Sequence, residues 1–249
     1  MKRVEPTRER TMLLLDTDPT SRTAGQYARA TVMRLRMRTL VALGVLAVPT
    51  ALLGRTFGLH DVRFLGAEVA LLVLMFVISR YVLPLVERRD RGARAEEQVG
   101  ALLEQLPRER WRVVHDATLG RGNVDHIVIG PAGVFTVETK SHPGPIKIGR
   151  LHGAMLAQAQ AQGKAIGWVT GVDAQPLIVF SRAWVDRPGG RRKGVRVLPA
   201  RMLVGFLERL PETLGRSEVN EAHGQLVAAL MEHQGRSGRY LGERWGLLR

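Results

Sequence analysis

Two long apolar runs constrain what this chain can fold into more than any other feature. Leu40–Leu53 carries no charged residue, and Phe64–Val86 carries only Glu68 and Arg80. A membrane-spanning helix needs roughly 20 mostly apolar residues. The second run has that length, and the first reaches it only if its helix continues past Arg55 with that side chain directed outward. We therefore predict a hairpin of two transmembrane helices, at about 39–59 and 64–86.

Arginines gather on the two outer flanks of this hairpin and are sparse in the link between its helices. The flanking set is Arg34, Arg36 and Arg38 on one side and Arg88, Arg89, Arg91 and Arg94 on the other. Cytoplasmic flanks of membrane helices carry such an excess of positive charge. We expect a cell-membrane protein whose N-terminus and following domain are cytoplasmic, with residues 1–38 as a basic tail. The alternative is a pair of buried helices in a soluble bundle.

The overall charge is strongly positive, at +14 with a calculated pI near 11.3. Such a balance fits a protein that binds a polyanion such as nucleic acid, although arginines beside membrane segments would produce the same imbalance. The chain contains no cysteine, which excludes disulfides and thiolate metal sites. Its histidines lack the spacing of a helix-borne zinc pair, so we assign none of them as a ligand.

A β-hairpin is predicted after the apolar runs. Val124–Ile129 and Val134–Lys140 are rich in Val and Ile, and the Gly-Pro-Ala-Gly sequence at 130–133 separates them. An antiparallel hairpin brings the start of its first strand close to the end of its second. Asp125, Glu138 and Lys140 are therefore expected to meet at one corner of the sheet.

Two carboxylates and an amine at one corner suit a hard divalent cation. Carboxylate oxygens are ligands that Mg²⁺ prefers, and two of them leave coordination positions for water and a phosphate. Lys140 could orient the attacking water and offset charge on the phosphate. The alternative is an ordinary salt bridge between Glu138 and Lys140 at a sheet edge, worth about 0–1 kcal/mol when exposed.

The residues around this corner resemble the nuclease-related domain (NERD) family. The resemblance runs from about Gly92 to Leu210 and is carried by four segments in matching order: Gly92–Val99, Val124–Phe135, Glu138–Lys140 and Gly144. It implies an α/β fold, a restriction-endonuclease-like mixed sheet flanked by helices, of the PD-(D/E)xK superfamily. It also implies a Mg²⁺-dependent phosphodiesterase site, with Mn²⁺ as a possible substitute.

The resemblance assigns roles to five residues. It implies that Asp125 and Glu138 are the metal ligands and Lys140 the catalytic lysine. It adds Glu96 as a further acidic residue and Gln158 as the glutamine of the helix that follows the core strands. On the residues alone, Glu96 is equally well explained by the favourable position of a carboxylate in the first turn of a helix.

The chain departs from the family pattern at three places. Ala95 stands where the family has Gly before the glutamate, Ser141 replaces the usual Asn after the lysine, and Ala154-Met155 replaces Asn-Pro before the glutamine helix. Three functions stay open: a membrane-anchored nuclease acting on nucleic acid, DNA more readily than RNA; a nucleic-acid-binding or tethering membrane protein without turnover; and a membrane scaffold with a purely structural charged corner.

The remaining segments complete the predicted organisation. Residues 87–211 are expected to form the nuclease-related domain, opening with a charged linker at 87–94, and residues 212–249 a C-terminal helix and basic tail. Gln158, Gln160 and Gln162 form a polar row on a predicted helix at 156–169, where most such glutamines would be solvated. The basic loop Arg187–Lys193 could bind phosphates or be only an exposed turn.

Overall fold

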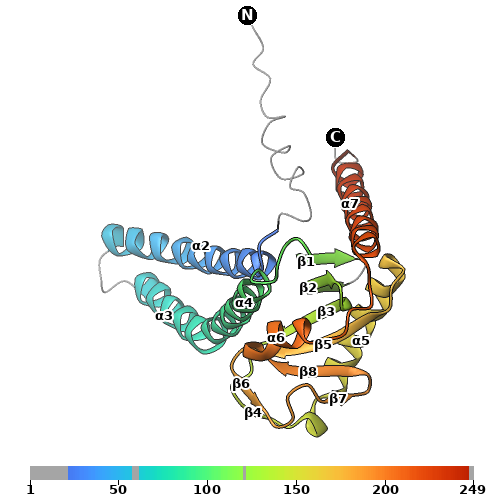
Figure 1. Cartoon of the computed structure of the whole chain (residues 1–249). Helices are drawn as coiled ribbons and strands as arrows, with labels where there is room; N and C mark the ends of the chain where they lie inside the picture. Colours follow the sequence, from blue (N-terminus) through green and yellow to red (C-terminus); the bar gives the residue numbers. More distant parts are fainter. Residues whose placement is uncertain (1–21, 58–61, 120–121, 247–249) are drawn as a thin grey trace, which may run out of the picture. The chain divides into compact units, whose positions relative to one another are not determined.

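The computed structural model describes residues 22–57, 62–119 and 122–246 (Figure 1). Residues 1–21 of the expected tail at 1–38 and residues 58–61 of the expected link therefore lie outside the described residues. The chain divides into two units, one formed by Gln26–Arg94 and the other by Ala95–Arg249 together with Met1–Gly25. Each unit is described by itself below.

The Gln26–Arg94 unit consists of long helices. Helix α2 spans Gln26–Phe57 and so begins well before residue 39, where we predicted the first apolar helix. Helix α3 spans Val62–Val77 and packs against α2. Ala28–Thr56 and the continuous helical stretch Leu65–Leu103 are long and apolar enough to cross a membrane, by length and composition only. Only 6% of each apolar window is buried, which disfavours the alternative of core helices in a soluble bundle.

The second apolar helix changes its winding before a proline. Residues Ile78–Val82 form a π-helical turn that connects α3 to helix α4 at Leu83–Leu103. Pro84 has no backbone N–H to bond to the carbonyl of Arg80 four residues earlier. A π-turn at this point re-arranges the hydrogen bonds locally while the helix continues.

The charged stretch Glu87–Arg94 is helical rather than a linker, which corrects our expectation. Glu and Arg are good helix formers, and no proline interrupts the segment after Pro84. Within it, Arg94 Nη2 donates to Asp90 Oδ2 at 2.7 Å, one helical turn away. Helix α4 therefore runs without a break into the residues that begin the second unit.

The second unit is built on a six-stranded mixed sheet. Its strands are β1 (Arg112–Leu119), β2 (Gly122–Gly130), β3 (Gly133–Lys140), β5 (Ala174–Phe180), β8 (Val195–Pro199) and β7 (Arg191–Arg192), in that order across the sheet. Strands β1, β2 and β3 are antiparallel neighbours, whereas β3, β5 and β8 are parallel. Strands β4 (Gly144–Ile146) and β6 (Ala183–Val185) form a separate parallel pair.

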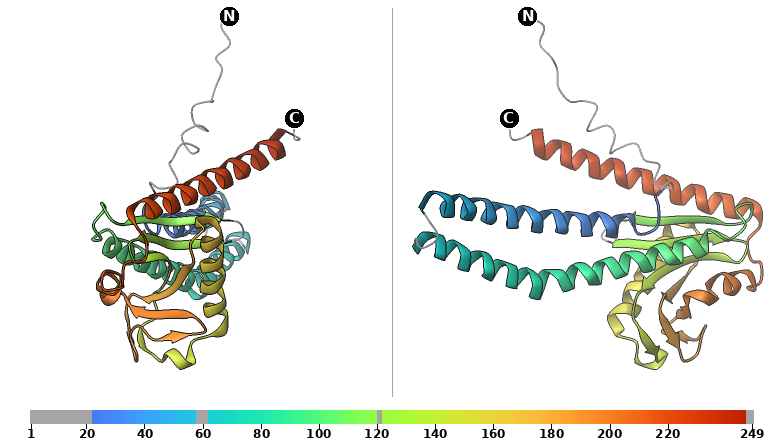
Figure 2. Two further views of the ribbon diagram at one scale, coloured as in Figure 1. Left: turned by 45° about the vertical axis from the view of Figure 1, so that its right-hand side comes forward. Right: turned by 90° about the vertical axis from the view of Figure 1, so that its left-hand side faces the viewer.

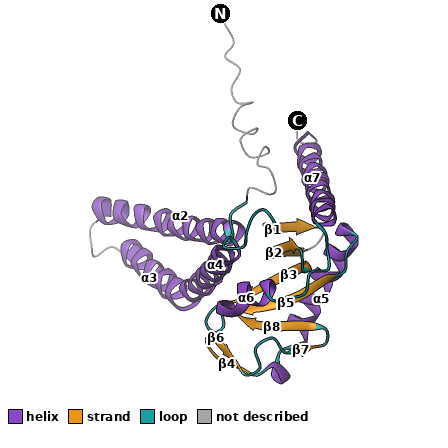
Figure 3. Ribbon diagram, viewed as in Figure 1, coloured by secondary structure: helices purple, strands orange, loops and turns teal. Residues whose placement is uncertain are grey.

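Helices cover both faces of the sheet (Figures 2 and 3). One face packs against the end of α4 and against α6 (Leu203–Glu208), with Phe135 and Val137 of β3 in that core. The other face packs against α5 (Gly153–Thr170) and α7 (Arg216–Gly246), with Val134 of β3 on that side. The alternation of these three side chains follows the two-residue period of a strand.

The predicted α/β class is confirmed: a mixed sheet is flanked by helices, and two long apolar helices precede it. The C-terminal helix is longer than we expected. We expected a helix and then a basic tail within residues 212–249, whereas α7 continues to Gly246.

Candidate active site

The site lies on the β2–β3 hairpin. A two-residue turn, Pro131-Ala132, joins the strands, and Gly130 pairs with Gly133 across it. Gly130 packs so closely on the Trp111 ring that a Cβ at this position would stand 2.1 Å from a ring carbon. The turn and this contact fix the register of the hairpin, and therefore which residues face each other at its open end.

At the open end, Asp125 and Glu138 occupy facing positions, one step beyond the His126–Val137 pair. The backbone N–H of Thr139 donates to Asp125 Oδ2 at 2.7 Å. This bond links the carboxylate of one strand to the backbone of the other. The predicted corner therefore exists as a bonded arrangement.

Glu138 is the centre of a hydrogen-bond network. Its carboxylate is 4% exposed. Lys140 Nζ donates to Glu138 Oε1 in an ion pair, and Gln158 Nε2 donates to the same oxygen at 2.9 Å. Gln162 Nε2 donates to the other oxygen, Oε2, at 2.6 Å. One strand residue and two residues of one helix thus hold a single carboxylate.

Helix α5 supplies both glutamines because they are four residues apart and so share one face. Gln162 is buried and also donates to the carbonyl oxygen of Asn123 at 3.0 Å, while its own Oε1 is buried without a hydrogen-bond partner. Gln160, between them, points elsewhere. The structure therefore brings Gln158 to the site, as the resemblance implied.

Negative charge is concentrated around Glu138. Burial first, and then the charges of Asp116 and Glu138, raise the pKa of Glu96 to about 7. Burial, followed by the charges of Glu138 and Glu96, raises the pKa of Asp125 well above its ordinary value. Lys140 opposes both shifts. All five residues that we singled out from the sequence therefore interact within one cluster.

Sequence reasoning missed two members of this cluster. Asp116 is 2% exposed, has a left-handed backbone with φ of 50°, and lies between the β1–β2 pairs that flank Asp125. Its Oδ1 accepts a hydrogen bond from Asn123 Nδ2 at 3.4 Å. Gln162 was the second, and its i, i+4 spacing from Gln158 was the signal that could have identified it.

A pair of buried histidines lies beside the cluster. His115 Nδ1 and His126 Nδ1 are 2.8 Å apart, and His115 Nε2 lies 3.1 Å from Glu104 Oε1. Burial, followed by the charge of His115, lowers the pKa of His126 to about 3. A side chain that stays neutral at ordinary pH and is hydrogen-bonded to another histidine is a structural group here.

The donor set fits a divalent cation shared by two carboxylates. Among the described residues, no three His, Asp or Glu side chains are arranged so that they alone could hold a metal ion. Mg²⁺, however, is commonly bound by one or two carboxylates and keeps several waters. A cation beside Asp125 and Glu138 would offset the repulsion that raises the Asp125 pKa. The chemistry of the site therefore matches this metal.

A basic groove opens next to the site. The backbone N–H of Ser181 donates to the carbonyl of Lys140 at 3.0 Å, which places the end of β5 beside the end of β3. Ser181 lines a groove of about 380 Å³ together with Arg182, Trp184 and Arg201. Ligands of open α/β sheets bind outside the carboxyl ends of the parallel strands, and the groove lies at that edge.

Comparison with known proteins relates one part of the chain to a known family model. Residues 91–181 match the family model described as "Nuclease-related domain" (NERD). A solved repair endonuclease from Pyrococcus abyssi is similar at 13% identity, with a TM-score of 0.28, over 49% of this chain and 47% of that one, so the chain spans about half the length of that endonuclease. No curated protein matches the chain.

The match to the family model is shorter than the Gly92–Leu210 range that we expected. It contains the five residues singled out from the sequence: Glu96, Asp125, Glu138, Lys140 and Gln158. The similarity to the nuclease-related domain therefore covers residues 91–181.

Proposed function

We propose that this chain is a membrane-anchored, Mg²⁺-dependent nuclease that hydrolyses phosphodiester bonds, with DNA as its expected substrate. The observation that carries the proposal is the network in which Lys140, Gln158 and Gln162 hold the buried carboxylate of Glu138 beside Asp125. A buried carboxylate held by so many donors keeps a fixed position, which is what metal-assisted catalysis requires.

Asp125 and Glu138 would hold Mg²⁺, with Mn²⁺ as a substitute. The metal would act as a Lewis acid toward a phosphoryl oxygen and lower the barrier to attack by water. Lys140 would orient the attacking water and offset charge on the phosphate. As the water oxygen bonds to phosphorus, the bond from phosphorus to the leaving sugar oxygen breaks. Gln158 and Gln162 keep the Glu138 carboxylate in place, and Glu96 adds negative charge to the cluster.

Cleavage is expected to depend strictly on a divalent cation. Purified full-length protein in detergent should cut DNA with Mg²⁺ or Mn²⁺ and leave it intact in EDTA, because the repulsion around Asp125 disfavours two unneutralised carboxylates beside a phosphate. The assay should use single-stranded DNA, double-stranded DNA and RNA in parallel, followed on denaturing gels. Cutting that persists in EDTA would contradict the proposal, and faster cutting of RNA would reassign its substrate.

The second candidate is a nucleic-acid-binding or tethering membrane protein without turnover. One observation favours it: Lys140 and two glutamines already donate to both oxygens of the Glu138 carboxylate. It predicts salt-sensitive nucleic-acid binding, since phosphate contacts dominate, with no cleavage in either metal. Absence of binding at low salt would eliminate this candidate.

The apolar helices are proposed to anchor the nuclease-related domain on the cytoplasmic side of the membrane. Their outward side chains are largely exposed in the structure, for example Val45 at 68% and Phe76 at 65%, which suits contact with lipid. The arginines on both outer flanks support this orientation, because cytoplasmic flanks carry an excess of positive charge.

Cysteine labelling tests the orientation, because the native chain has no cysteine. In intact cells, a membrane-impermeant maleimide should label His60→Cys, in the link between the helices. Ser217→Cys, at the start of α7, should be labelled only after the membrane is permeabilised. The reverse pattern would invert the topology, and recovery of the chain in the soluble fraction would remove the anchor.

A further inference from the structure

A second groove lies at the opposite end of the parallel strands from Glu138. It has a volume of about 370 Å³ and is formed by α5, the start of β5 and the turn between β7 and β8. Lys164 and Trp168 of α5 and Lys193 of the turn line it. Its floor forms because α5 lies very close to β5: a Cβ at Gly163 would stand 3.1 Å from the carbonyl oxygen of Ala174.

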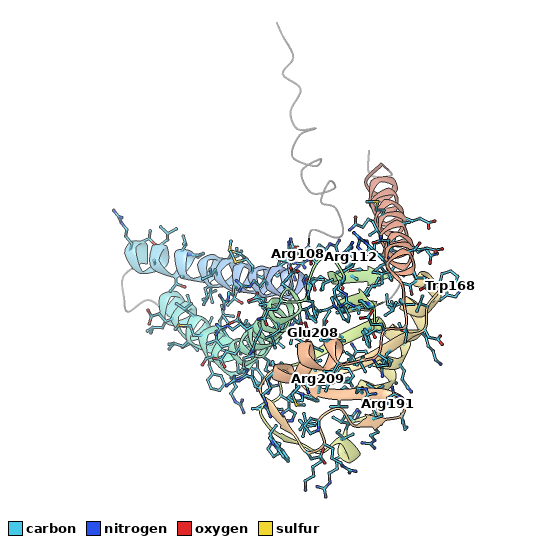
Figure 4. All side chains as sticks on the ribbon, in the orientation of Figure 1. Arg108, Arg112, Trp168, Arg191, Glu208 and Arg209 are labelled. Atoms are coloured by element: carbon cyan, nitrogen blue, oxygen red, sulfur yellow. The ribbon has the colours of Figure 1, made fainter. Side chains whose placement is uncertain are left out.

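Trp168 is unusually exposed for its type. The residue is 88% exposed and projects outward from α5 (Figure 4). Tryptophan is mostly apolar and is normally well covered in a folded domain. In this groove two lysines, Gln160 and Asp173 share the lining with glycines, Ala174 and Pro176, so charged groups stand beside an apolar floor. An indole presented in this way has a free π-face beside positive charge.

The turn at Lys193-Gly194 carries a residue that is poorly suited to its backbone. Both residues have positive φ, 49° and 79°, as a two-residue type I′ hairpin turn requires. Asn or Gly is the usual first residue of this turn, because other side chains are strained there. Gln160 Nε2 donates to the carbonyl of Lys193 at 2.6 Å, which holds the turn against α5. The fold thus keeps a lysine at a strained position and fixes it beside the groove.

We propose that this groove binds a single-stranded stretch of nucleic acid, with one base stacked on Trp168 and its phosphates beside Lys164 and Lys193. Stacking on aromatic rings combined with a basic groove is how proteins bind single strands without reading sequence. A base inside a duplex is already stacked on both faces and cannot cover the indole. A membrane surface fits less well, because insertion needs several exposed apolar side chains, and Trp168 is the large one that lines this groove.

The proposal rests on the nuclease function and specifies its substrate. Gln158 and Trp168 are ten residues apart on α5, which corresponds to about 15 Å along the helix. The bound strand would have to cover about this length between the reacting phosphate and the stacked base. The groove would therefore hold a single-stranded flank of the substrate while Glu138 and Lys140 act on the phosphodiester.

The test measures binding with cleavage switched off, so that it is independent of catalysis. Full-length protein in detergent and EDTA is titrated with a 5′-fluorescein-labelled 12-nucleotide dT oligomer, and anisotropy gives the Kd. Trp168→Ala should weaken binding about 5- to 150-fold, the range found for loss of one stacked base. The control is Met231→Ala. Met231 is an apolar residue of a different helix, α7, and is 51% exposed, so its replacement should leave the Kd unchanged. Equal Kd values for wild type and Trp168→Ala would overturn the proposal.

The phosphate contacts of Lys164 and Lys193 are tested by the salt dependence of binding, and melting temperatures report separately on folding. Lys193→Asn should raise the melting temperature, since Asn suits the turn, and yet weaken oligomer binding. Each of Lys164→Ala and Lys193→Asn should reduce the slope of log K against log salt by about 0.7, the value per phosphate contact for single strands. Arg108→Ala, whose side chain is 83% exposed and ion-paired with Glu104, is the charge control. Unchanged slopes in both lysine variants would overturn the phosphate contacts.

Two further readouts separate this groove from the active site and from a membrane role. With Mg²⁺, Trp168→Ala should raise KM for a substrate with a single-stranded flank and leave kcat within about twofold, whereas failure of the nuclease function would abolish turnover in wild type as well. Subtracting the tryptophan emission of Trp168→Phe from that of the wild type isolates the emission of Trp168. This emission should change when the oligomer is added. A response to phosphatidylcholine–phosphatidylglycerol vesicles and none to the oligomer would assign the groove to a membrane and overturn the proposal.

Discussion

Replacing Glu138 with Gln is expected to lower the rate of DNA cleavage by at least about a hundredfold, the loss typical when one preorganised electrostatic group is removed. The substitution keeps the size of the side chain and its carbonyl oxygen but removes the charge. Lys140 then loses its ion-pair partner, and the amide cannot accept donors on both ends as the carboxylate does from Gln158 and Gln162. Cleavage rates over a range of Mg²⁺ concentrations measure the effect.

The metal response distinguishes loss of a ligand from loss of structure. If Glu138 holds the cation, the variant should need more Mg²⁺ for half-maximal rate and should lose stabilisation by Mg²⁺ in thermal melts. Glu109→Gln removes the same charge from an exposed position and serves as the control. A Glu138→Gln variant that cuts DNA at the wild-type rate would exclude Glu138 from the catalytic site.

The second large effect concerns stability and pH, and its sign follows from the raised pKa of Glu96. The folded-state pKa is about 7 against an ordinary value of 4.5. Between these values the folded chain binds more protons than the unfolded chain, so the free energy of unfolding falls as pH rises. The contribution of Glu96 to the free energy of unfolding is fully present below about pH 4.5. It is lost as the pH rises through about 7. Asp125, whose pKa is also raised, acts in the same direction.

Glu96→Gln should therefore stabilise the protein at pH 8 and have little effect at pH 4.5. The shift in pKa would correspond to about 3 kcal/mol for a fully buried group, and partial solvent screening of Glu96 reduces this to about 1–2 kcal/mol. For a protein of this size that is about 2–8 °C in melting temperature. Circular dichroism melts at several pH values in EDTA provide the measurement.

Two comparisons check the origin of this effect. Glu109→Gln removes an exposed charge that does not contribute to the raised Glu96 pKa, and should reproduce the wild-type pH profile. Added Mg²⁺ should flatten the wild-type profile, because a cation at Asp125 and Glu138 offsets the repulsion that raises the Glu96 pKa. A wild-type melting temperature that rises between pH 5 and pH 8 as Glu96 ionises would contradict the predicted direction of the pH dependence.

The hairpin and its corner were predictable because they depend on local sequence. Alternating Val and Ile residues, a Gly-Pro-Ala-Gly turn and the antiparallel register were enough to place Asp125 near Glu138. The approach of α5 was not predictable from residues alone, since a row of glutamines reads equally well as a solvated helix face. The family resemblance identified Gln158, whereas Gln162 required the helix to be docked on the sheet.

Other misses have similar physical causes. The charged segment Glu87–Arg94 reads as a linker by composition, yet its residues favour helix, and α4 continues through it. Asp116 gave no signal because its role depends on a left-handed backbone conformation within a strand. That conformation is rare for a residue other than glycine, and only the three-dimensional structure reveals it.

Because side chains alternate along β3, the site should be sensitive to insertions before Glu138 and insensitive to insertions after Lys140. Glu138 shares a face with Val134, toward α5, whereas Phe135 and Val137 face α4 and α6. One residue inserted or deleted between Gly133 and Glu138 would turn the carboxylate toward the opposite helices and separate it from Gln158 and Gln162. Insertions after Lys140 lengthen the connection to α5 and leave the acidic pair in register. The connection after Lys140 is therefore the place where a longer loop would leave the hairpin intact.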